Sequence, residues 1–214
     1  LGVKFLPMGN TGNQMGGWFN KEMNTADDYK GLKMRMPGLG GRTIGKLGAT
    51  AVLMGGPDIL TSLASGAIDA AEWICPVADL GLGMHQAAKF YYGPGWHEPS
   101  TLLDLSIDLK EWEGLDADTQ ALMMEMAKAF NVDVFSRFQA LNGPALGKLL
   151  NEHGVQLKTF PDELLIALGN AAGEVMEERG SINSQTKAIC NHLLSFRKNI
   201  MDWSTKGCLL YTSP

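Results

Sequence analysis

The sequence predicts an α/β fold, and three observations support it. In the first hundred residues, short apolar runs alternate with turn signals, and some runs have strand alternation while others have helical spacing. From Lys110 onward, apolar residues recur mainly at helical spacing. The chain has 214 residues, of which 45% are hydrophobic and 19% charged, which is enough for a globular core. Short strands alternating with short helices favour a largely parallel sheet.

The first half contains four predicted strands and four predicted short helices. Pro7 is expected to end the first strand and Pro37-Gly38 the second, because proline cannot continue a ladder. Gly66 is expected to close the third helix. The strands are predicted at 3–6, 32–36 and 51–53, and residues 67–73 are predicted to be a strand or an extended segment. A loop is predicted at 9–12, and the helices are predicted at 25–28, 43–47, 59–63 and 77–82.

The second half is predicted to be a helical layer. Asp116 is a suitable N-cap for a helix that reaches about Leu141, where Asn142-Gly143-Pro144 is expected to break or kink it. A short strand at 155–158, a helix from Pro161 to about Arg179 with Asp162 and Glu163 in its first turn, and a helix at 182–203 follow. Residues 205–214 have no helical period and resemble a translated sequencing adapter, so we predict a non-native tail.

Charge and composition exclude several classes of function. The net charge of -5 argues against nucleic-acid binding, and an anionic ligand would need a local positive group. No apolar run approaches the roughly 20 residues that span a bilayer. The three cysteines are too scattered for a disulfide framework or a zinc site. The first residues do not have the pattern of a signal peptide, and there is no initiator Met. We therefore expect the chain to start inside a longer protein.

Arg35 is the first candidate ligand residue. It lies in an apolar strand directly before the glycine-rich run 37–41. A guanidinium at a strand end can hold a carboxylate through two parallel hydrogen bonds, and glycines allow a ligand to approach. The alternative is an edge-strand arginine paired with a surface acid.

The same glycine-rich run also has a weaker interpretation as a dinucleotide site. Gly38, Gly40 and Gly41 stand between a strand and a helix, as in a dinucleotide fingerprint. However, position 43 is Thr instead of the third glycine. The following strand also ends without the acid that binds ribose.

Glu72 and Trp73 follow a short apolar run and form the second candidate. A carboxylate beside a bulky ring at a strand end suits a ligand or cation site, although an exposed Glu and a core Trp are the alternative. Gln14 lies in a glycine-rich loop, where a solvated side chain is common. Gln14 and Glu72 together would supply oxygen ligands for Na⁺ or Ca²⁺ rather than for zinc.

No catalytic arrangement is visible in the sequence. His97 has no recognisable nucleophile or orienting partner, and we predict a structural role for it. The Met-rich stretch at 123–126 is more simply helix core than a cofactor site.

Five segments resemble one known family, and the resemblance extends from about Val3 to Ser204. The segments are Gly9-Asn10-Thr11-Gly12, Gln14-Met15-Gly16-Gly17-Trp18-Phe19, Leu32-Lys33-Met34-Arg35-Met36-Pro37-Gly38-Leu39-Gly40-Gly41, Gly66-Ala67-Ile68-Asp69-Ala70-Ala71-Glu72-Trp73 and Tyr91-Tyr92-Gly93-Pro94-Gly95-Trp96-His97-Glu98-Pro99. In order and spacing they resemble the DctP family of TRAP transporter solute-binding proteins. Within that family they are similar to the TakP-like branch, which binds α-keto acids or lactate.

The resemblance implies the periplasmic solute-binding-protein fold, with two lobes, a ligand cleft between them and a long spanning helix. It implies that most of the N-terminal lobe, roughly a hundred residues, precedes this chain. Residues 1–93 would form the second α/β lobe with crossover strands. Residues 94–204 would return to the first lobe and supply the long helix and the C-terminal helices.

The resemblance also implies the site and the partners. Arg35 would grip the ligand carboxylate, while Gln14, Glu72 and the carbonyl of Trp73 would hold Na⁺ or Ca²⁺ that also contacts the ligand, with Glu98 near the cation. The ligand would be a 2-oxo or 2-hydroxy monocarboxylate, and no organic cofactor is expected. A different carboxylate or a sugar acid is the alternative, and a metal-dependent enzyme is a more distant one. The location would be periplasmic, and the partners would be TRAP membrane subunits and a second copy of the chain in a homodimer.

Overall fold

The computed structural model describes residues 2–208, with side chains described as far as Ser204, and the chain divides into two compact units, residues 1–168 and 169–214. The first half contains β1 (Val3–Asn10), β2 (Gly17–Phe19), the 3-10 helix η1 (Ala26–Tyr29), β3 (Lys33–Arg35), α1 (Gly38–Lys46), β4 (Thr50–Val52), α2 (Gly56–Ala64), β5 (Ala70–Ala71), α3 (Pro76–Leu82), the 3-10 helix η2 (Met84–Gln86), β6 (Phe90–Gly93) and β7 (Leu102–Asp108). The second half contains α4 (Leu109–Glu113), α5 (Ala117–Asn151), β8 (Gln156–Thr159), α6 (Asp162–Gly180) and α7 (Ser184–Cys208). The α/β prediction is confirmed.

A six-stranded mixed sheet forms the centre of the first unit, in the order β4-β3-β5-β2-β6-β8. The pairings of β3 with β4, of β3 with β5 and of β6 with β8 are parallel, whereas β2 is antiparallel to both of its neighbours. Only β2 therefore runs against the other five strands. Strand β8 comes from the second half of the chain, so the sheet is completed by residues far from its first strands.

The two faces of this sheet bury two separate cores, because successive side chains of a strand point to opposite faces. On one face, Phe19, Ala70 and Tyr92 pack with Ile44 of α1 and Leu164 of α6. On the other face, the adjacent residues of the same strands (Trp18, Ala71 and Tyr91) pack against α2 and the end of α5. That second core contains Trp18, Ala71, Tyr91, Ile59, Leu63 and Leu149.

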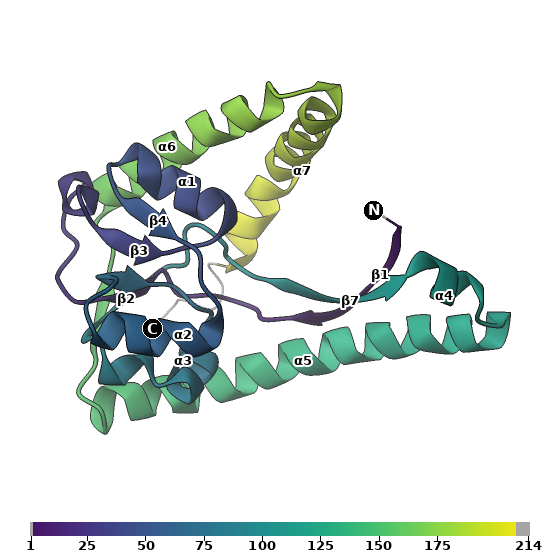
Figure 1. The fold of residues 1–214 in the computed structure, drawn as a ribbon, viewed down its shortest axis with the longest axis horizontal. Helices are drawn as coiled ribbons and strands as arrows, with labels where there is room; N and C mark the ends of the chain where they lie inside the picture. Colours follow the sequence, from purple (N-terminus) through teal and green to yellow (C-terminus); the bar gives the residue numbers. More distant parts are fainter. Residues whose placement is uncertain (1, 209–214) are drawn as a thin grey trace. The chain divides into compact units, whose positions relative to one another are not determined.

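A two-stranded ribbon, β1 with β7, forms a separate antiparallel sheet. Figure 1 shows the ribbon alongside the long helix α5. Leu6, Trp112 and Ala127 form a small core between β1, α4 and α5. Strand β1 leads into the loop 11–16, and the loop 94–101 leads into β7. These two loops are neighbours in space, and the Thr11 amide donates to the Thr101 carbonyl at 3.0 Å.

The second unit consists of most of α6 and the helix α7. Asn183 caps α7, since its carbonyl Oδ1 accepts a hydrogen bond from the Thr186 amide at 2.9 Å. Several large apolar side chains of α7 are exposed, among them Ile189, Leu193 and Phe196. No helix within residues 2–208 combines the length and the apolar character needed to cross a membrane.

Proline had less effect on the backbone than predicted. Strand β1 continues through Pro7 to Asn10, with a register shift between Pro7 and Gly9, so the prediction that Pro7 ends the strand is wrong. A strand with a single neighbour has a free edge, where a missing N–H is tolerated.

Helix α5 likewise runs through Pro144 to Asn151 without a break. Leu149 is buried beyond the proline, and Asn142 accepts a hydrogen bond from the Val77 amide at 3.1 Å before it. Packing on both sides outweighs the roughly 3 kcal/mol that an internal proline costs.

Other boundaries also moved. Helix α1 begins at Gly38 rather than Thr43, so the glycine-rich run is its first turn, and a Cβ on Gly41 would lie 2.6 Å from the Met36 carbonyl. The predicted strand at 67–73 contracts to Ala70–Ala71. Strands β2, β6 and β7 were not predicted.

The C-terminal tail differs in part from the prediction. The backbone of α7 extends to Cys208, so the expectation of no helix after 204 is wrong for residues 205–208. Residues 209–214 lie outside the described part of the chain. The division at residue 93 stays a prediction, and so does the non-native tail.

Candidate functional site

The candidate residues Arg35 and Glu72 lie at the ends of neighbouring strands. Arg35 is the last residue of β3, and Glu72 directly follows β5, which pairs in parallel with β3 in the register Arg35↔Ala71. The Glu72 amide donates to the Arg35 carbonyl at 3.1 Å. Carboxyl ends of parallel strands meet at one edge of the sheet, which is where α/β folds collect ligands.

Arg35, Glu72 and His97 form one buried polar cluster. The Arg35 Nη1 group donates to the Glu72 carbonyl at 2.9 Å and forms an ion pair with Glu72 Oε1. His97 Nε2 lies 3.0 Å from the other carboxylate oxygen, and the three side chains are 9%, 2% and 2% exposed. The Arg35 guanidinium carbon lies 5.2 Å from the ring centroid of Trp73. The arginine is thus paired with an acid, but inside the protein rather than on its surface.

His97 was predicted to be structural, and the structure places it against the carboxylate of Glu72. The motif Trp96-His97-Glu98-Pro99 was visible in the sequence. No spacing rule connects it with Glu72, however, which is 25 residues away. Sequence reasoning therefore missed this contact.

Gln14 belongs to a second polar group. Its Nε2 donates to Thr11 Oγ1 at 2.9 Å and to Thr101 Oγ1 at 2.6 Å, and Thr101 Oγ1 donates to Glu98 Oε1 at 2.8 Å. The other amide atom, Gln14 Oε1, is buried and has no hydrogen-bond partner within the described part of the chain. A buried acceptor without a partner is costly, so an oxygen of this kind is suited to receive a ligand.

Backbone hydrogen bonds bring the two polar groups together. The Met15 amide donates to the Ile74 carbonyl at 2.9 Å, and the Gly95 amide donates to the Gln14 carbonyl at 3.0 Å. A Cβ on Gly95 would lie 2.7 Å from the Gln14 carbonyl oxygen, so glycine permits this close approach. The five predicted residues therefore lie in two adjoining groups, with Arg35, Glu72 and Trp73 in one and Gln14 and Glu98 in the other.

These residues fit a hard cation bound through few charges. No three His, Cys, Asp or Glu side chains within residues 2–208 gather closely enough to hold a metal. A site made of Gln14 Oε1, one carboxylate oxygen of Glu72 and a backbone carbonyl needs no such cluster. Oxygen atoms of this kind are the ligands that Na⁺ and Ca²⁺ prefer. The unpartnered Gln14 Oε1 is the observation that favours the fit.

Asp79 of α3 is a buried carboxylate close to this region that the sequence analysis did not single out. Its Oδ2 accepts hydrogen bonds from Trp18 Nε1 and from the Tyr91 hydroxyl, both at 2.8 Å, and its Oδ1 accepts from the Ile74 amide at 3.0 Å. Burial raises the pKa of Asp79 to about 6, although the three hydrogen bonds favour the ionised form.

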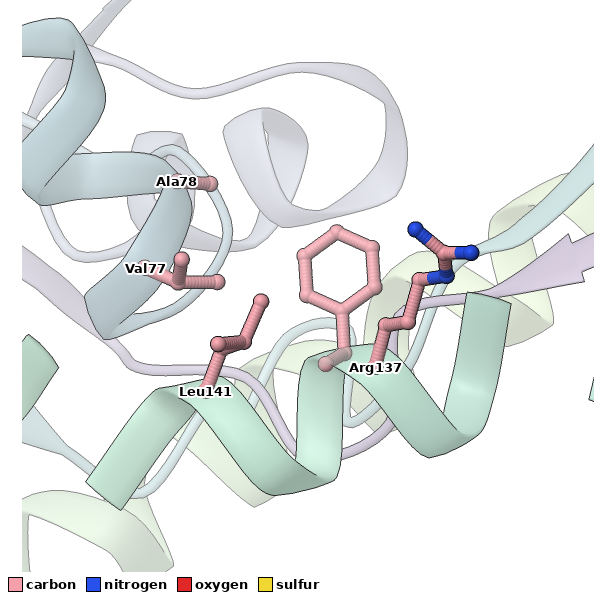
Figure 2. Close-up of a pocket in the computed structure, with 5 residues that line it drawn as sticks. Val77, Ala78, Arg137 and Leu141 are labelled. Atoms are coloured by element: carbon pink, nitrogen blue, oxygen red, sulfur yellow. The ribbon is translucent and has the colours of Figure 1, made fainter. Parts of the chain in front are cut away.

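An apolar pocket of about 250 Å³ lies away from these residues, between α3 and α5. Figure 2 shows Val77 and Ala78 of α3 facing Leu141 and Arg137 of α5. Arg137 is exposed and pairs with Asp133 at 2.8 Å. No residue of the two polar groups lines this pocket, so it is not the predicted site.

Comparison with known proteins gives a consistent result. The model of the DctP family, described as bacterial extracellular solute-binding protein, family 7, matches residues 2–181. A monocarboxylate 2-oxoacid-binding periplasmic protein of Nostoc sp. is 40% identical over 96% of the chain, which spans 56% of that relative.

Two solved structures are similar over almost the whole chain. A TRAP periplasmic solute-binding protein of Pseudoalteromonas atlantica with bound sodium and pyruvate is 35% identical, with a TM-score of 0.93, 100% of this chain covered and 65% of that chain. A TRAP periplasmic solute-binding protein of Colwellia psychrerythraea with bound calcium and pyruvate is 37% identical, with a TM-score of 0.92, 98% of this chain covered and 64% of that chain.

Proposed function

The chain belongs to the DctP family of bacterial extracellular solute-binding proteins, and we propose from this premise that it binds a small 2-oxo or 2-hydroxy monocarboxylate, such as pyruvate or lactate, for uptake by a TRAP-type transporter. The Nostoc relative is named for 2-oxoacid binding, and both solved relatives hold pyruvate. We place the protein in the periplasm. The membrane subunits of the transporter and a second copy of the chain are its proposed partners.

The buried pair of Arg35 and Glu72 at neighbouring strand ends carries this proposal. Arg35 is the positive group that an overall acidic protein needs in order to hold an anion. Its planar fork can donate two parallel hydrogen bonds to a ligand carboxylate. To do so, Arg35 exchanges or shares its contact with Glu72.

Gln14, Glu72 and the carbonyl of Trp73 are proposed to hold Na⁺ or Ca²⁺, with Glu98 close by. When bound, the cation supplies positive charge for the ligand's carboxylate and its 2-oxo or 2-hydroxy oxygen. Two-point recognition of this kind distinguishes a 2-oxo acid from a simple fatty acid. No organic cofactor is required.

Calorimetric titration tests the proposal. Pyruvate, lactate, longer 2-oxo acids and galacturonate would be titrated into the chain and into a chimera in which it replaces the matching part of the Nostoc relative. Each titration would be run with cation, with chelator and in Na⁺-free buffer. We expect cation-dependent binding of a 2-oxo or 2-hydroxy acid by the chimera. Binding of galacturonate alone would favour the sugar-acid alternative, and no binding of any compound would overturn the proposal.

The proposal also states that the protein is not an enzyme. The family consists of solute-binding proteins, and a metal-dependent enzyme would need a general base beside the cation. Incubation with the bound acid followed by NMR of the small molecule is expected to return it unchanged. Conversion of the acid would contradict this part of the proposal.

A further inference from the structure

We propose that Asp79 is a positioning residue for the cation site, because it holds the peptide group whose carbonyl belongs to Trp73. This inference rests on the proposed function, in which the Trp73 carbonyl is a cation ligand. Asp79 itself is not a candidate ligand, since both of its carboxylate oxygens already accept hydrogen bonds from the protein. Its effect would pass through one peptide bond.

The geometry follows from the planarity of the peptide group. The carbonyl of Trp73 and the amide of Ile74 are the two ends of one trans peptide, and they point in opposite directions in its plane. Asp79 Oδ1 accepts a hydrogen bond from the Ile74 amide at 3.0 Å. Fixing the direction of this N–H therefore fixes the direction of the Trp73 carbonyl, away from Asp79.

The neighbouring peptides are held by other contacts. The Glu72 carbonyl accepts from Arg35 Nη1 at 2.9 Å, and the Ile74 carbonyl accepts from the Met15 amide at 2.9 Å. Both of those contacts use the carbonyl oxygens themselves. Asp79 instead holds the N–H end of the middle peptide, an arrangement that directs the carbonyl oxygen of Trp73 without using it.

Asp79 is itself fixed from two sides. Trp18 Nε1 of β2 and the Tyr91 hydroxyl of β6 both donate to its Oδ2 at 2.8 Å, and their rings stack with centroids 4.1 Å apart. With Oδ2 held in this way, Oδ1 is left for the Ile74 amide. The buried sheet thereby sets the orientation of a peptide at its edge.

The charge of Asp79 adds to the effect of its position. A carboxylate that accepts a hydrogen bond from a peptide N–H polarises the amide and increases the negative charge on its carbonyl oxygen. Groups that orient metal ligands in this way commonly change metal affinity by about 10- to 100-fold when removed. We therefore expect Asp79 to strengthen cation binding without touching the cation.

The test compares two substitutions in the protein that shows cation-dependent binding in calorimetry. Asp79→Asn removes the charge from the group that holds Ile74, and we expect Ca²⁺ affinity to fall about tenfold or more. Ile59→Val removes a methylene from the same buried core as Trp18 and Tyr91 without touching any hydrogen bond of Asp79, so it is the matched control. It is expected to lower the melting temperature while Ca²⁺ affinity stays close to that of the wild type.

Two results of this comparison would overturn the inference. One is wild-type Ca²⁺ affinity in Asp79→Asn. The other is an equal loss of Ca²⁺ affinity in Ile59→Val, which would show that general stability is responsible. Absence of cation dependence in the unmodified protein would instead contradict the proposed function itself, so the two failures are distinguishable.

A measurement on the unmodified chain covers the case in which Asp79→Asn does not fold. Trp73-Ile74 is the only Trp-Ile pair in the sequence, so labelling Trp with carbonyl ¹³C and Ile with ¹⁵N gives one resonance for this peptide. We expect the Trp73 carbonyl ¹³C shift to change on addition of Ca²⁺. Calorimetric binding of Ca²⁺ without any change in this resonance would overturn the inference.

Discussion

Glu72 and Gln14, one from each polar group of the candidate site, differ in how fully their side-chain oxygens are paired. In the group around Arg35, both carboxylate oxygens of Glu72 are engaged, one by Arg35 and the other by His97. In the group around Gln14, the amide nitrogen has two partners while the buried oxygen has none within residues 2–208. The oxygens of Glu72 are therefore already occupied, whereas Gln14 Oε1 is open to a ligand.

This difference indicates where ligand binding has a cost. A carboxylate that approaches Arg35 competes with an ion pair that is already formed in a buried place. A cation that approaches Gln14 displaces no protein partner from Oε1. Cation and carboxylate together would provide new partners for Glu72 and Arg35 at the same time, so their binding is expected to be mutually dependent. The predictions below test this contrast.

Arg35→Ala is expected to have the largest effect. It removes the group that would bind the ligand carboxylate and leaves Glu72 buried beside His97 alone. Breaking a buried ion pair in this way typically costs about 3–5 kcal/mol of stability. We expect ligand binding to fall below detection in calorimetry and the free energy of unfolding to decrease in denaturant titration. Arg42→Ala, an exposed arginine of α1, is the matched control and should change neither. Wild-type binding by Arg35→Ala would remove Arg35 from the site.

Glu72→Gln is expected to have the next largest effect. Gln keeps the size of the side chain and an acceptor for Arg35, so we expect a stability loss of about 1–3 kcal/mol. The charge that balances the cation is lost, and carboxylate affinity should become weaker and less dependent on added cation. Calorimetry with and without chelator measures both. Glu98→Gln serves for comparison and should have the smaller effect; the reverse order would move the cation away from Glu72.

Gln14→Leu is expected to be milder for stability, because it removes two side-chain hydrogen bonds of about 1 kcal/mol each and also the unpartnered oxygen. Cation dependence should decrease. Gln14→Glu places a charge at the same position and should strengthen Ca²⁺ binding instead. If both variants weaken Ca²⁺ binding equally, Gln14 Oε1 is not a cation ligand.

The last prediction concerns the pH dependence of stability and involves no change in the proposed ligand residues. The pKa of Asp79 is raised from 3.8 to about 6 by burial, so between these values the folded protein binds more protons than the unfolded chain. The contribution of Asp79 to the free energy of unfolding should therefore decrease as pH rises from about 4 to about 6. Denaturant titrations across this range in the wild type and in Asp79→Asn isolate the contribution, which the Asn variant lacks. Identical slopes would contradict the raised pKa.

The sequence predicted the long helices, which have a strong period, and missed the strands β2, β6 and β7. The N-cap Asp116 is confirmed by its hydrogen bond to the Thr119 amide at 2.9 Å. Strand β2 has only three residues, all buried, so no alternation marks it. Pro144 was misjudged because packing against the sheet, which local sequence does not show, keeps the helix continuous.

The site was predictable to a similar extent. Arg35 and Glu72 were found because each stands at the end of an apolar run, and parallel neighbours bring such ends together. Their ion pair and the contact with His97 depend on the order of the strands, which the sequence did not reveal. Asp79 has no motif around it, and only its three hydrogen-bond donors mark it.

The hydrogen bonds of Trp18 and Tyr91 to one carboxylate also constrain how related sequences can vary. A leucine at position 79 would leave an indole N–H and a phenol O–H buried without an acceptor, and a lone phenylalanine at position 91 would remove one of the donors that hold the acid. Viable variants are therefore expected to change these three positions together. Covariation among positions 18, 79 and 91 in a family alignment would be the evolutionary trace of this arrangement.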